Sequence, residues 1–151
     1  MNQDSSFTPA ERLESLKAGL LAALGTGLTF VILYFIHGLI AQPLAASLVQ
    51  LGIQVAIALF SGFLFGVTYR YVIRTDQNLQ LNTGAVFAFG VIRGLAIVEN
   101  QGLNLQQWVD ILMAIAQRCD RSIAENIILF AVAAIVLNIA FQQGWVKRFP
   151  G

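Results

Sequence analysis

Arg93 is the residue whose type and position point most directly to chemistry, because it lies inside an apolar run. The run extends from Gly84 to Val98 and holds no other charged residue. A charge inside a membrane segment needs a partner and suggests a functional site. Glu99 and Glu125 are the acids expected to reach it. Arg93 then either orients its segment through a buried contact or recognises an anionic headgroup, a quinone oxygen or a partner carboxylate.

A polar stripe lies on the apolar segment that precedes Arg93. Its members differ by four and seven positions and so share one helical face: Gln50, Gln54, Ser61 and Thr68. Such a stripe predicts interhelical hydrogen bonds or, as the alternative, the wall of a small polar pathway. In that alternative an oligomer would carry a polar route lined by Gln50, Gln54, Arg93 and Asn138.

His37 is the one candidate for a cofactor ligand, near the end of the first apolar run. It could ligate a metal or a chlorophyll magnesium, but no second ligand stands at helical spacing from it. An interfacial hydrogen bond is therefore the favoured role. Cys119 is the only cysteine, which excludes an internal disulfide and any multi-cysteine metal site. We expect no metal and no cofactor.

The sequence lacks the motifs of common enzymes. It has one histidine and no GxSxG, HExxH, GxxxxGK[ST] or GxGxxG, so acyl transfer, zinc hydrolysis and nucleotide chemistry lack their residues. We predict no enzymatic activity and no catalytic residues. The net charge of +1 gives a nucleic-acid partner no electrostatic support.

Composition places the chain in a bilayer. Of its 151 residues 57% are hydrophobic and 11% charged, and the mean hydropathy is +0.71. A soluble domain carries about 25% charged residues. Apolar runs of this length match a hydrocarbon core about 30 Å thick. The sequence therefore predicts a multi-pass integral membrane protein with the lipid bilayer as a partner.

The predicted fold is all-α, an integral membrane helical bundle of four spans plus an interfacial amphipathic helix. Residues 1–7 form a flexible N-terminus and residues 8–151 a single membrane domain. Thr8, Pro9 and Glu11 form a capping box with proline at the first helical position. The spans are expected at about 18–41, 47–72, 82–98 and 124–145, and the amphipathic helix at 104–121.

The third span is short. Arg93 costs about 2.5 to 3.5 kcal/mol at a helix centre, and eight large apolar residues return roughly 4 kcal/mol. Insertion is marginal, so a re-entrant segment is the alternative. Gly62 and Gly66 form a GxxxG pair on a face of the second span separate from its polar stripe, which predicts that this span is packed on two sides at the centre of the bundle. Gly90 and Gly94 form a second GxxxG pair, which predicts packing of the third span against the second.

Charge distribution indicates the orientation. With four spans, one side holds Arg12, Lys17, Arg70, Arg74, Lys147 and Arg148, and the other holds Arg118 and Arg121. Both termini would then face the cytoplasm or stroma. The arginines of the segment YRYVIR, together with Trp145 to Arg148, are expected to anchor helix ends at the headgroups, reaching to water. A three-span arrangement also places most Lys and Arg residues on the cytoplasmic side. The four-span arrangement is preferred, because it places Trp145 to Arg148 on the same side as the other two cytoplasmic anchors.

The segments FGVTYRYVIR (65–74) and GAVFAFGVIRGL (84–95) resemble small uncharacterised multi-span proteins of cyanobacterial and plastid membranes. The resemblance implies a thylakoid or bacterial inner membrane and a role beside photosynthetic or electron-transfer complexes. It carries over no site residues. We therefore expect a non-enzymatic accessory, assembly or stabilising protein that binds a larger membrane complex or self-associates. A small oligomeric transporter or channel component is the alternative.

Overall fold

The computed structural model describes residues 9–41, 48–73, 79–99 and 108–148, with the backbone alone at 40, 41, 79, 97–99 and 108–121. It contains four α-helices: α1 Pro9–Ala41, α2 Leu48–Val72, α3 Leu79–Glu99 and α4 Trp108–Gln142. The all-α prediction is confirmed. The expected flexible N-terminus at 1–7 and the cap at Thr8 lie outside the described residues.

Helix ends follow local sequence signals. α1 begins at Pro9, where the fixed φ of proline suits the first helical position, and ends at Ala41, before Pro43. α4 ends in a Schellman motif at Gly144, whose φ of 74° is in the left-handed region. The Trp145 amide donates to Ala140 O at 3.0 Å, and the Gly144 amide donates to Phe141 O at 3.4 Å.

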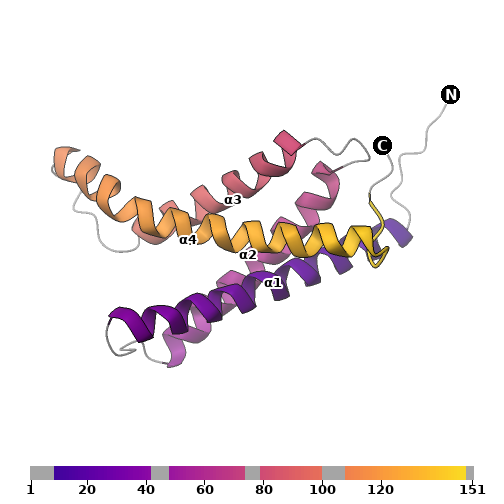
Figure 1. The fold of residues 1–151 in the computed structure, drawn as a ribbon, viewed down its shortest axis with the longest axis horizontal. Coiled ribbons are helices and arrows are strands. Elements are labelled where there is room, and N and C mark those ends of the chain that lie inside the picture. The colour runs from indigo at the N-terminus through magenta and orange to yellow at the C-terminus, as the bar shows by residue number, and fades with distance from the viewer. Residues whose placement is uncertain (1–8, 42–47, 74–78, 100–107, 149–151) are drawn as a thin grey trace.

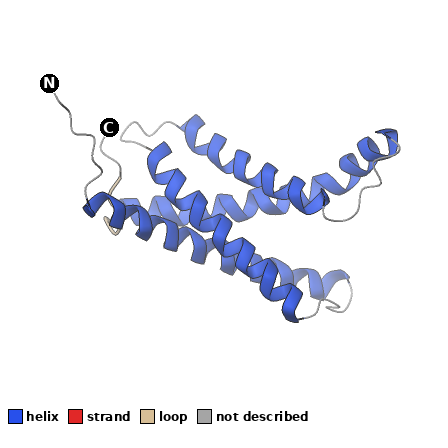
Figure 2. Cartoon of the chain, turned by 180° about the vertical axis from the view of Figure 1, so that it is seen from behind, coloured by secondary structure: helices blue, strands red, loops and turns tan. Residues whose placement is uncertain are grey.

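The four helices form two antiparallel hairpins. α1 packs along α2, α3 packs along α4, and contacts between α1 and α4 are the main join between the two pairs. Figure 1 shows the hairpins close together at the end near both chain termini and separating toward the opposite end, and Figure 2 shows the same splaying from behind. The splayed end lies beside the last turns of α1 and the first turns of α2.

Small residues join α1 to α2. A Cβ atom at Gly66 would lie 2.5 Å from Ala18 O and 2.6 Å from the Ala22 side chain, and one at Gly62 would run into Thr26. Ala18, Ala22 and Thr26 are fully buried. The glycine pair of α2 therefore allows a close helix contact, and the partner helix is α1.

The second glycine pair has a different neighbour from the one we predicted. Cβ atoms at Gly90 and Gly94 would lie 2.9 Å from Ile127 Cα and 2.8 Å from Ile123 Cα, so both glycines face α4. The prediction that α3 packs on α2 through them was wrong, since α2 already uses its glycine face for α1. The sequence shows that a close approach occurs but does not name the partner helix.

The predicted boundary between an amphipathic helix at 104–121 and a last span at 124–145 is absent. α4 runs continuously from Trp108 to Gln142, bending in its first third (Figure 1). A change from polar to apolar residues does not end a helix without glycine, proline or a cap, and 118–125 has no glycine or proline. Residues 104–107 and the side chains of the amphipathic face lie outside the described part.

Large apolar side chains cover the outside of the bundle. On α1 the exposed side chains recur every three or four residues: Leu20, Leu24, Leu28, Ile32, Phe35 and Leu39. Within the described residues, three helices are long and apolar enough to cross a membrane, covering Pro9–Leu39, Leu48–Val72 and Ser122–Gln142. Apolar exteriors around small-residue contacts suit a bilayer, and the chain has the properties of a multi-pass integral membrane protein.

Arg70 does not reach to water as we predicted for the anchor YRYVIR, since it is only 1% exposed. Its Nε donates to Lys147 O at 2.9 Å, and its Nη1 donates to Ser15 Oγ at 2.6 Å and to Glu11 O at 3.1 Å. The Lys147 amide in turn donates to Glu14 Oε2 at 2.9 Å. Arg70 therefore joins α1, α2 and the C-terminal segment at the closed end of the bundle.

Candidate binding groove

A groove of about 780 Å³ lies at the splayed end, between the two hairpins. Every helix contributes to it. Aromatic and aliphatic side chains make one part of the wall: Phe30, Leu33, Tyr34, Ile53, Ile57, Ala96 and Leu129. Polar side chains make the rest: His37, Gln50, Gln54, Arg93, Ser122, Glu125 and Asn126. A volume of this size is within the range of small-ligand sites.

Arg93 is held in the groove by neutral groups. Its Nε donates to Asn126 Oδ1 on α4 at 2.8 Å, and its Nη1 donates to Ser61 Oγ at 2.8 Å and to Ile57 O at 3.0 Å on α2. Among the described residues no carboxylate forms a salt bridge with it. Its Nη2 makes no hydrogen bond there either, and it is not buried.

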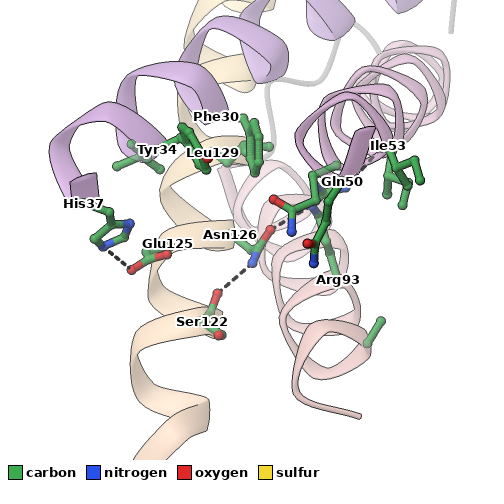
Figure 3. Close-up of a pocket in the computed structure, with 14 residues that line it drawn as sticks. Phe30, Tyr34, His37, Gln50, Ile53, Arg93, Ser122, Glu125, Asn126 and Leu129 are labelled. Carbon is green, nitrogen blue, oxygen red and sulfur yellow. Dashed lines mark hydrogen bonds and ion pairs between the residues drawn. The ribbon is translucent and has the colours of Figure 1, made fainter. Parts of the chain in front are cut away.

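The expected acidic partners of Arg93 are placed elsewhere. The Glu125 carboxylate is bound by His37 Nε2 at 3.0 Å, across to α1. The side chain of Glu99 lies outside the described part, and position 99 is about 9 Å along α3 and about 120° around it from Arg93. In Figure 3, Glu125 points to His37 while the adjacent Asn126 points to Arg93. The two neighbouring residues of α4 thus bind side chains on different helices, Glu125 one on α1 and Asn126 one on α3.

Asn126 orients the guanidinium. Its Nδ2 donates to Ser122 O at 2.7 Å, one helical turn earlier, which directs Oδ1 toward Arg93. Ser61 donates its own proton to Ala58 O at 3.0 Å, so its oxygen is available to accept from Arg93. Thr26 donates to the same Ala58 carbonyl at 3.1 Å. One hydrogen-bond network therefore links all four helices through Arg93.

An aromatic layer closes the bundle one turn below this network. Phe65, Phe89 and Phe130 come from α2, α3 and α4, with ring centroids 5.1 to 5.6 Å apart. Each stands four residues from Ser61, Arg93 or Asn126, on the side toward the chain termini. Phe65 and Phe130 are fully buried. The groove therefore ends at the Arg93 network rather than continuing through the molecule.

The four residues of the predicted polar route do not line one continuous cavity. Gln50, Gln54 and Arg93 line the groove together. Asn138 lies below the aromatic layer, where its Nδ2 donates to Tyr69 Oη at 3.1 Å. Thr68, also on the predicted stripe, is exposed and donates to Leu64 O of its own helix.

Sequence reasoning missed Asn126 and the role of Ser61 as a ligand of Arg93. Asn126 could have been noticed as an amide near the start of the last apolar run, where a polar side chain needs a partner. Its pairing with Arg93 was not readable, since it depends on the packing of α3 on α4. His37 binds Glu125, as expected for an interfacial hydrogen bond. Among the described residues no group of three or more His, Cys, Asp or Glu side chains could hold a metal.

Comparison with protein-family models, with curated proteins and with solved structures gives no match in any of the three.

Proposed function

We propose that the protein is a non-enzymatic accessory or stabilising subunit of a larger membrane complex, and that the groove between its hairpins holds a second molecule. The observation that carries this proposal is the charge of Arg93. It lies in an open groove with one nitrogen free for a ligand and only neutral partners among the described residues. A buried or half-buried charge normally has a counter-ion, so the missing anion is expected from outside this part of the chain.

We further propose that all four helices cross the bilayer, with both termini on the cytoplasmic or stromal side. α3 has 21 residues, about 31 Å of helix, which matches the hydrocarbon core. The contacts of Arg93 with Ser61, Ile57 O and Asn126 lower the cost of its insertion. Figure 1 shows the first turn of α1 and the last turn of α4 at the same end of the bundle, which supports an even number of crossings. The thylakoid or bacterial inner membrane is supported by the resemblance of 65–74 and 84–95.

The alternative, an oligomeric transporter or channel component, is favoured by one observation: Gln50, Gln54 and Arg93 line a common groove. The aromatic layer of Phe65, Phe89 and Phe130 opposes it, because a solute leaving the groove toward the chain termini would have to displace buried rings. A pathway through a single copy would need that layer to open.

The test is the native mass and composition of the tagged protein, extracted from its own membrane in a mild detergent. Comigration with a defined larger complex is the expected result, and mass spectrometry would name the partner. Arg93→Leu should leave the abundance of the protein unchanged and weaken that comigration, whereas Lys17→Gln, at an exposed ion pair on α1, should not. A small homo-oligomer with nothing else bound would contradict the accessory role and favour the transport alternative.

A further inference from the structure

We infer that the groove binds a membrane amphiphile with one anionic headgroup, a phosphate or a carboxylate, and that the headgroup is held by Arg93. This inference deepens the proposed function, since it names the chemistry of the molecule in the groove. It follows from the charge, the size and the polarity of the groove.

Within the described residues, the guanidinium of Arg93 has one edge free for a ligand. Asn126, Ser61 and Ile57 O occupy Nε and Nη1 of Arg93 and fix the plane of the group, while Nη2 is left for a ligand. A preoriented guanidinium of this kind favours an anionic oxygen, because charge-assisted hydrogen bonds are about twice as strong as neutral ones. The carboxylate of Glu125 does not compete, since His37 binds it on the α1 side (Figure 3).

The size of the groove suits a small ligand. The groove offers about 780 Å³, which is within the range of about 300 to 1,000 Å³ for small-ligand sites. The groove is therefore large enough for a headgroup with part of an acyl chain.

Part of the groove wall is apolar. Ile53 and Ile57 on α2 are more than half exposed, and Phe30 and Leu129 line the groove from α1 and α4. An acyl chain could contact these apolar side chains while its headgroup meets Arg93. The amphiphile would fill the wedge between the two hairpins and complete the surface that a larger complex meets.

Two variants of the groove test the role of the charge. Arg93→Gln removes the cation. Asn126→Asp keeps Arg93 but supplies a carboxylate at the position of the amide oxygen, 2.8 Å from Nε. In Asn126→Asp the new carboxylate is the counter-ion of Arg93, so the variant should fold. It should nevertheless bind the anionic ligand less tightly, because the charge of Arg93 is already neutralised. Glu99→Gln controls for the acid at the end of α3, and Lys17→Gln controls for a cation far from the groove.

The measurement is native mass spectrometry of the detergent-purified full chain with four separate probes: phosphatidylglycerol, oleate, phosphatidylcholine and inorganic phosphate. We expect one bound phosphatidylglycerol or oleate, and their relative affinity distinguishes a phospholipid from a free fatty acid. Arg93→Gln and Asn126→Asp should each weaken binding about tenfold, the range expected for one charge-assisted hydrogen bond. Glu99→Gln and Lys17→Gln should bind as the natural chain does.

Three results would overturn the inference. If phosphatidylcholine binds as tightly as phosphatidylglycerol, the anionic charge of the ligand is not recognised. If inorganic phosphate binds as tightly, the apolar wall does not contribute to binding. If Asn126→Asp binds phosphatidylglycerol as tightly as the natural chain does, Arg93 does not hold the headgroup. None of these bears on comigration with a complex, which tests the proposed accessory function separately. If the protein comigrates with a complex but binds no amphiphile, only this inference is contradicted. If it binds an amphiphile but does not comigrate with a complex, only the accessory role is contradicted.

Discussion

His37 binds Glu125 across the mouth of the groove at 3.0 Å, so one of the acids expected for Arg93 is paired with the histidine instead. The contact joins the end of α1 to α4, the two helices that hold the hairpins together. Both side chains are about one-third exposed, at 34% and 31%.

Removal of the His37 contact should have a small effect. Exposed ion pairs contribute about 0 to 1 kcal/mol, so His37→Ala should lower the free energy of unfolding in detergent by less than about 1 kcal/mol. The absorption spectrum of the purified protein should be identical for both chains. Loss of a pigment band in His37→Ala would show that the histidine is a ligand and contradict its hydrogen-bonding role.

Packing of α1 on α2 should depend on Gly66 and not on Gly52. A Cβ atom at Gly66 meets backbone and side-chain atoms at 2.5 to 2.9 Å, whereas Gly52 of the same helix has no atom within 4 Å. Gly66→Ala should destabilise the bundle by about 1 to 3 kcal/mol, the usual cost of overpacking. Gly52→Ala is the matched control and should leave thermal unfolding unchanged. Equal effects of the two variants would refute the close approach.

The C-terminal segment should become accessible when Arg70 is replaced. Arg70→Met removes the bonds to Lys147 O, Ser15 and Glu11 O, at a cost of about 2 to 3 kcal/mol for hydrogen bonds to a charged group. Limited trypsin digestion, read by intact mass, should then cleave faster after Lys147. Thr68→Ala removes only a hydrogen bond within α2 and should digest like the natural chain.

Cysteine labelling can count the crossings. In a Cys119→Ser background, a cysteine at Ala10 and one at Gln143 should react from the same side of the membrane, and one at Leu48 from the opposite side. All three positions are exposed in the structure. Labelling of Ala10→Cys and Gln143→Cys from opposite sides would establish three crossings and exclude a membrane-spanning α3.

The sequence by itself determined the elements of this protein. Apolar runs of membrane length predicted the α1, α2 and last-span segments, and Pro9 and Pro43 marked the two ends of α1. Helix periodicity also identified Arg93 and the glycine pairs as unusual positions. These properties are local, because they depend on the lengths of apolar runs and on residues within one or two helical turns.

Only the tertiary structure decided which positions meet. Gly90 and Gly94 face α4 because α2 presents its own glycines to α1, and that choice depends on the packing of all four helices. Asn126 rather than an acid binds Arg93 for the same reason, since residues from separate helices come together only when the hairpins pack. Arg70 was expected in water and is buried, because the turn after α4 returns Lys147 to the start of α1. The groove and its free guanidinium edge are therefore products of the tertiary fold.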